Sequence, residues 1–194
     1  DMGESVFGDF ESMDLRIGEV MEVKDHPNAD KLMVLEVDIG KRIRLVAGLK
    51  GHYEKEQLEG KRIVVLINLK PAKLRGIKSQ GMLLAADHGD EVRVLVPAGE
   101  TTVGERVNSN MASSSQQLGF EDFQKLDLRI GEVGGDGKVD VGRQVQLEAP
   151  SGYEPPSKVA VFLPSDSDRA LPLFTENEVP ITVDGDISKG ARVR

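Results

Sequence analysis

The chain has 194 residues, of which 39% are hydrophobic and 30% charged. This composition fits one large or two small soluble domains and excludes collagen-like and low-complexity chains. No apolar run is long enough to span a membrane, the N-terminal residues lack the features of a signal peptide, and the absence of cysteine excludes disulfides and thiolate metal sites, so we expect a cytoplasmic protein. The net charge of −8, taken alone, argues against binding to nucleic acid.

Short runs rich in Val, Ile and Leu predict a β-rich first half, because most of them are bounded by Gly, Pro, Asn or Asp. In chain order the predicted strands are residues 14–23, 32–39, 41–49, 61–69, 81–86 and 91–97, and residues 53–59 predict a helical turn. A helix between the third and fourth of about five strands is the layout of the OB-fold, a five-stranded Greek-key barrel, although other small barrels and sandwiches share such strands. We therefore predict an all-β fold of OB type with one short helix.

The sequence contains an internal repeat. FESMDLRIGEV at residues 10–20 corresponds to FQKLDLRIGEV at residues 123–133, and PAGETTVGERV at residues 97–107 corresponds to VDGDISKGARV at residues 183–193. Between the two copies, NSNMASSSQQLG is uncharged and has the composition of a flexible linker. We predict a first domain at 1–107, a linker at 108–119, and a second, smaller and degenerate OB-like domain at 120–194.

The charge is unevenly distributed. Residues 60–86 contain six basic and no acidic residues, so the rest of the chain carries −14. Within this window residues 68–82 read NLKPAKLRGIKSQGM, where Pro71 ends a strand and Gly76 and Gly81 allow tight backbone paths. These features predict a projecting loop over residues 70–80, whose cations can engage adjacent phosphates. The alternative is a set of solvated strands that lysines keep soluble.

Three ordered motifs resemble a known family: DLRIGEV at residues 14–20, HPNADKL at residues 26–32 and NLKPAKLRGIKSQGM at residues 68–82. Together they are similar to the tRNA-binding domain found at the C-terminus of methionyl-tRNA synthetases, in the endothelial monocyte-activating polypeptide, in synthetase-associated cofactors and in small stand-alone tRNA-binding proteins. The resemblance covers residues 10–107. It implies an OB-fold that grips folded tRNA at its elbow, largely without sequence readout.

The expected tRNA-binding residues come from two arguments. The resemblance implies Asn68, Lys70, Lys73, Arg75, Ser79 and Met82, and the position and chemistry of the side chains add Lys78, Gln80, Arg42 and Arg44. A place in a core strand is the alternative for Met82. Tyr53 is the only aromatic residue between Phe10 and Phe120, which favours recognition of phosphates and shape over base stacking.

We expect no catalytic residue, metal site or cofactor. The chain has three histidines and no cysteine, and His26, in DHPNAD, is read as part of a turn. The expected function is therefore a non-catalytic module that binds tRNA, in trans or as an appendage of an aminoacyl-tRNA synthetase. Methionyl-tRNA synthetase is the first candidate for that enzyme. A chaperone-like protein-binding adaptor or a scaffold of a synthetase complex is the alternative, and we expect no membrane partner.

The second copy lacks both the HPNADKL and the KPAKLRGIKSQGM motifs and carries nine basic against fourteen acidic residues. It keeps the N-terminal segment and C-terminal strand through which bacterial stand-alone relatives form homodimers. We therefore expect a pseudo-dimer partner within one chain, and a monomer. A homodimer, or docking of another protein by this copy, is the alternative.

Overall fold

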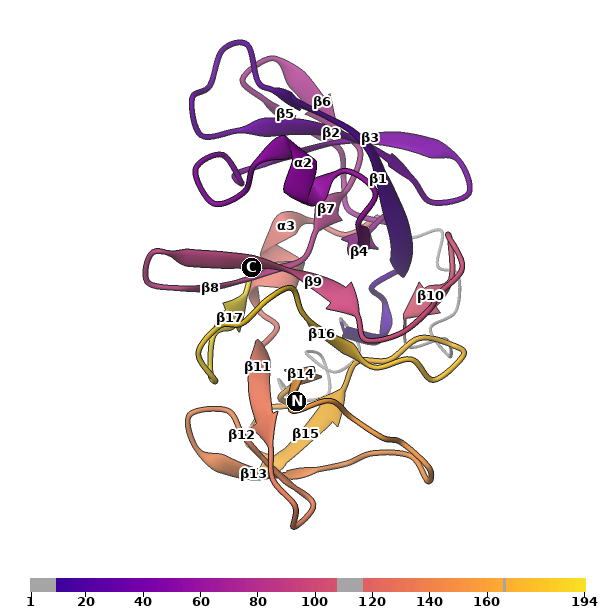
Figure 1. Ribbon diagram of the computed structural model, residues 1–194, viewed down its shortest axis with the longest axis vertical. Coiled ribbons are helices and arrows are strands. Elements are labelled where there is room, and N and C mark those ends of the chain that lie inside the picture. The colour runs from indigo at the N-terminus through magenta and orange to yellow at the C-terminus, as the bar shows by residue number, and fades with distance from the viewer. Residues whose placement is uncertain (1–9, 108–116, 166) are drawn as a thin grey trace.

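The computed structural model describes residues 10–107, 117–165 and 167–194, which form two β-barrels stacked along the long axis of the molecule (Figure 1). No helix in these ranges is long and apolar enough to cross a membrane. The fold is all-β, and each half of the chain contributes an OB-like barrel, as predicted.

The first barrel is built from a six-stranded sheet. The strands are β1 (Leu15–Asp25), β2 (Met33–Asp38), β3 (Arg42–Ala47), β4 (Arg62–Leu66), β7 (Met82–Leu83) and β10 (Arg106–Val107). They follow the order β3-β2-β1-β4-β7, with β10 also paired to β1. The short helix α2 (Lys55–Leu58) lies between β3 and β4, in the predicted place. Alternate residues of β2 are buried inside the barrel, which is the period of two that the sequence predicts.

Strand β1 turns the corner of the barrel by changing partner. Its first part pairs with β4 and its second part with β2, and the register shifts between Val20 and Glu22. Such a bulge bends a strand and increases its twist. Gly18 lies at the crossing, where an added Cβ would stand 2.6 Å from a methyl carbon of Val37. The glycine of the DLRIGEV motif is therefore needed for close approach of two strands.

The second barrel is smaller and follows helix α3 (Phe120–Gln124). Its strands are β11 (Leu128–Val133), β12 (Lys138–Asp140), β13 (Gln144–Leu147), β14 (Lys158–Phe162) and β15 (Arg169–Pro172). They follow the order β12-β13-β15-β14-β11, and the pairing of β12 with β11 closes the barrel.

The two copies of the repeat make the same local contacts. Arg16 pairs with Asp14 at 2.7 Å in the first copy, and Arg129 pairs with Asp127 at 2.7 Å in the second. Gly131 lies at the equivalent crossing of the second barrel, since an added Cβ there would lie 2.4 Å from a methyl carbon of Val139. The repeated motif therefore encodes one structural corner twice.

The two halves share a sheet and a hydrophobic core. The hairpin of β8 (Ala85–His88) and β9 (Glu91–Pro97) belongs to the first half, yet β8 pairs with β17 (Arg192–Val193) and β9 pairs with β16 (Ile181–Val183). Buried residues of both halves form one cluster, in which the ring of Phe10 stacks on that of Phe162 with centroids 4.2 Å apart. The strand predicted at 81–86 is split at Leu84, because the chain leaves β4 there to join this second sheet.

Most of the predicted linker, residues 108–116, lies outside the described residues. Its end is described: Leu118 is buried and forms a bridge with Leu69 beside the end of β4. The boundaries of the two domains remain a prediction.

Candidate nucleic-acid interface

The predicted loop over residues 70–80 contains a β-hairpin. Strands β5 (Ala72–Leu74) and β6 (Ile77–Ser79) pair antiparallel around a two-residue turn of Arg75 and Gly76. Both turn residues have positive φ, 53° and 91°, which is the geometry that suits the twist of a tight hairpin. The hairpin projects at the end of the first barrel farther from the second (Figure 1).

The hairpin concentrates unpaired positive charge. Its register places Lys73 directly opposite Lys78, and Arg75 stands at the tip. These three residues and Lys70 are exposed, and within the described part of the chain none of the four forms an ion pair. Like charges on opposite positions of a hairpin are destabilising, so this arrangement favours an anionic ligand that relieves the repulsion. We call residues 70–80 with these four cations the cationic hairpin.

Two polar residues fix the base of the cationic hairpin to β3. The Ser79 hydroxyl, which is buried, accepts a hydrogen bond from the Val46 N–H at 3.0 Å and donates to the Gly81 carbonyl at 2.9 Å. The Gln80 N–H donates to the Arg44 carbonyl, and the Gln80 side-chain oxygen accepts from the Arg44 N–H, both at 2.8 Å. The structure thus places these expected RNA donors within the protein's own hydrogen bonds.

The tip of the cationic hairpin is held by His26. The Asn28 N–H donates to Nδ1 of His26 at 2.9 Å, so the neutral ring carries its proton on Nε2. That Nε2–H donates to the carbonyl of Leu74, next to the turn, at 2.9 Å. The ring is buried, with 5% of the residue exposed. The turn predicted at HPNADKL therefore also supports the hairpin, a role that the sequence analysis did not assign.

Asn68 and Met82 flank the cationic hairpin in the chain and lie deeper. The side-chain amide of Asn68 donates to the Ser12 carbonyl at 2.7 Å, and its oxygen accepts from the Asp14 N–H at 2.9 Å. Met82 is partly buried and packs against the shared core. Asn68 follows β4 and Met82 begins β7, so both residues lie where the hairpin leaves the barrel.

The two arginines of β3 differ in their surroundings. Arg42 is exposed near the end of the strand, whereas Arg44 forms an ion pair with Glu36 at 3.0 Å. Arg44 and Ile77 line a hollow of about 190 Å³ together with Glu22, Asp25 and Glu36.

Each carboxylate of this hollow has a basic partner, since Glu22 pairs with Lys24, Asp25 with Lys50 and Glu36 with Arg44. The ammonium group of Lys50, 2.7 Å from Asp25, lowers the pKa of that carboxyl, which is therefore charged at neutral pH. The charges around this hollow therefore largely compensate one another, in contrast to the four unpaired cations of the hairpin.

Within the described ranges there is no group of three or more His, Asp or Glu side chains that could hold a metal ion. Toward an anion, the lysine ammoniums of the cationic hairpin can act as point charges, and the Arg75 guanidinium can bind a phosphate through two parallel hydrogen bonds.

Comparisons with known proteins show what the first half is similar to. Residues 15–106 match the family model described as "Putative tRNA binding domain". The methionine–tRNA ligase of Pyrococcus horikoshii is 55% identical over 102 residues, and that of Thermotoga maritima is 54% identical over 101 residues. Each match covers 52% of this chain but only 14% and 16% of the respective ligase.

One solved structure is similar to both barrels. The crystal structure of the C-terminal domain of Plasmodium vivax p43 matches 95% of this chain and 98% of its own chain, with a TM-score of 0.67 and 25% sequence identity. The arrangement of two barrels in one chain is therefore shared with that domain.

Proposed function

Because residues 15–106 belong to the tRNA-binding domain family, we propose that this chain binds folded tRNA through the cationic hairpin. It does so as a non-catalytic module, in trans or as an appendage of an aminoacyl-tRNA synthetase, with the methionyl enzyme first because the curated relatives are methionine–tRNA ligases. The observation that carries the proposal is the set of four exposed, unpaired cations on a hairpin whose base and tip are both held by hydrogen bonds.

The proposed contacts divide into two kinds. Lys70, Lys73, Arg75 and Lys78 bind phosphates, since their charged groups are exposed and lack acidic partners among the described residues. Asn68, Ser79 and Gln80 position the hairpin, because their side chains are bonded to the barrel backbone. Contacts to phosphates carry no direct sequence information, so the hairpin discriminates RNA by shape.

The remaining expected residues take lesser parts. Arg42 extends the cationic surface along β3, whereas the charge of Arg44 is partly neutralised by Glu36. Met82 supports β7 at the foot of the hairpin. We assign neither arginine a contact as strong as those of the four hairpin cations.

The second half is proposed to act as a pseudo-dimer partner of the first. The pairing of β17 with β8 and of β16 with β9, together with the common core, supports this role. The second half has more acidic than basic residues and no counterpart of the cationic hairpin in its sequence. It therefore stabilises the tRNA-binding half and does not bind RNA by the same means.

The experiment is tRNA binding over a series of salt concentrations. With about four phosphate contacts, the logarithm of the association constant should fall with the logarithm of salt concentration at a slope of about −3 to −4. The double variant Lys70→Glu/Arg75→Glu should weaken all tRNAs to a similar extent and flatten this slope.

The matched control is Lys138→Glu/Arg143→Glu. Both residues are exposed in the second half, so the control changes the net charge by the same amount at a distant surface. We expect it to bind tRNA nearly as the wild type does. An unchanged affinity of the hairpin variant, or an equal loss in the control, would refute the proposed site.

A further inference from the structure

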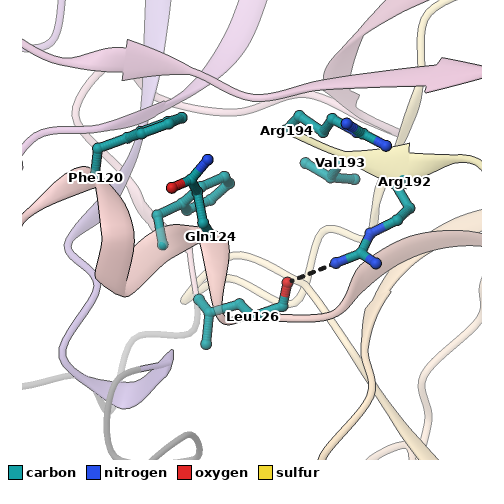
Figure 2. A pocket seen from close by; sticks show the side chains of 7 residues that line it. Phe120, Gln124, Leu126, Arg192, Val193 and Arg194 are labelled. Carbon is teal, nitrogen blue, oxygen red and sulfur yellow. Dashed lines mark hydrogen bonds between the residues drawn. The ribbon is translucent and has the colours of Figure 1, made fainter.

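A hollow of about 440 Å³ opens in the second half, between helix α3 and strand β17. Figure 2 shows Phe120 and Gln124 of this helix on one side and Arg192, Val193 and Arg194 on the other. Phe120 is 48% exposed, and it is the only aromatic residue among the large hydrophobic side chains exposed in the described ranges. The volume of the hollow is within the range of small-ligand sites.

The hollow combines an aromatic face with two cations. The Arg192 guanidinium makes one long hydrogen bond, 3.5 Å, to the Leu126 carbonyl, and the Arg194 guanidinium lies 3.5 Å from the Asp87 carboxylate. The backbone of Arg192 is fixed between two strands, because it pairs with Asp87 of β8 and with Arg129 of β11. The sheet fixes the backbone of Arg192, while the guanidinium groups of both arginines can still turn toward an anion.

A second hollow, of about 310 Å³, leads from this place toward β3, beside the base of the cationic hairpin. It shares Phe120 and Arg194 with the first hollow and continues past Met82 to Val46. Val46 is the residue whose N–H is bonded to Ser79 at the base of the hairpin. Asp87 is the single acidic side chain among the residues that line the two hollows, and it is paired with Arg194, so acidic side chains offer a polyanion little repulsion along this path.

We propose that the hollow at α3 binds an unpaired nucleobase of the same tRNA, with its phosphate held by Arg192 and Arg194. The base stacks on the face of Phe120, and the Gln124 amide hydrogen-bonds its edge. This inference rests on the proposed function and adds to it a base contact that the hairpin, which has no aromatic residue, does not provide. A nucleotide fits the hollow because it pairs a planar apolar surface with an adjacent anion, and the hollow offers a partner for each.

The test compares Phe120→Leu with Phe120→Tyr. Leucine keeps the apolar bulk but removes the aromatic face, whereas tyrosine keeps the face. We expect Phe120→Leu to weaken tRNA binding by about five- to a hundredfold, the range for loss of one stacked base, and to leave the salt slope unchanged. Phe120→Tyr should bind as the wild type does, and Arg192→Gln should reduce the magnitude of the slope by about one.

An RNA duplex without unpaired bases is the second probe, for which Phe120→Leu and wild type should have equal affinity. If Phe120→Leu binds tRNA as well as wild type does, while Lys70→Glu/Arg75→Glu binds weakly, the base site is refuted and the proposed function stands. The hollow would then be a site for a protein ligand. Equal losses in Phe120→Leu and Phe120→Tyr would also refute stacking. Failure of the wild type to bind tRNA would refute the proposed function itself.

Discussion

His26 connects two segments that are distant in the sequence, since its ring bonds Asn28 on one side and Leu74 on the other. The neutral ring can donate from Nε2 and accept at Nδ1 at the same time, which few other side chains of this size can do. Because the Leu74 carbonyl adjoins the Arg75–Gly76 turn, this bond fixes the direction of the hairpin tip. The histidine therefore orders the cations although it lies below the surface.

We expect His26→Ala to weaken tRNA binding about three- to tenfold, because one buried hydrogen bond holding the tip is lost and the cations must be ordered on binding. Equilibrium binding by fluorescence anisotropy measures this effect. His52→Ala is the control, since His52 is exposed and should not affect binding. A folded His26→Ala protein with wild-type affinity would show that the tip is positioned without this contact.

Single residues also show where prediction from sequence succeeds and fails. The four cations of the hairpin could be identified because charge, proline and glycine are local signals. The anchoring roles of His26, Ser79 and Gln80 could not, because each depends on a backbone group 33 to 48 residues away. Such pairings are set by tertiary packing and leave no periodic trace in the sequence.

At the scale of elements, the strands of the first barrel were predictable and the edges of the second sheet were not. Strand β2 alternates buried and partly buried residues, so its face is evident from sequence. The segment predicted as one strand at 81–86 changes neighbours at Leu84, and its new partner β17 lies at the far end of the chain. Hydrophobicity predicts that such a segment is buried but does not identify the strand beside it.

The elements of the two halves are also joined by polar contacts. The Tyr53 hydroxyl donates to the Asp184 carboxylate at 2.9 Å and accepts from the Val94 N–H at 3.1 Å, and Lys61 forms an ion pair with Asp184 at 3.0 Å. Burial, reinforced by Asp184, raises the pKa of Tyr53 to about 12. The neutral phenol is thus the form that the folded protein stabilises.

We expect Tyr53→Phe to lower the free energy of unfolding by about 1–2 kcal/mol at neutral pH, since the Val94 N–H loses its partner. A raised pKa of an acid contributes stability that is complete below the unfolded value of 10.0 and declines as the pH rises toward 12. The difference in free energy of unfolding between wild type and variant should therefore shrink above pH 10. Denaturant unfolding at neutral pH and above pH 10 measures this change.

Tyr153→Phe is the matched control. Tyr153 is partly buried and burial raises its pKa to about 12, but its buried hydroxyl has no hydrogen-bond partner within the described residues. Removing that hydroxyl should not destabilise the protein. A loss of stability in Tyr153→Phe equal to that in Tyr53→Phe would contradict the role of the two hydrogen bonds of the Tyr53 hydroxyl.

At the scale of the whole molecule, the proposed pseudo-dimer implies that the second barrel occupies the surface that a second copy of the first would use in a symmetric dimer. Strand β17 fills the edge of β8 and β16 fills the edge of β9. Sedimentation velocity at micromolar concentration should therefore give a monomer of about the chain mass, 21.1 kDa. A tight dimer under these conditions would refute the pseudo-dimer proposal, because the edges would have to be free to form it.

The hairpin of β8 and β9 has a strand from the second half on each of its two sides. Cutting the chain in the segment between the barrels and discarding the second half would uncover both edges at once, together with the apolar side of Leu84 and Leu95. A sheet fragment open on both sides readily recruits other strands. The first half is therefore not a detachable unit, and its solubility depends on a partner barrel that has no counterpart of the cationic hairpin.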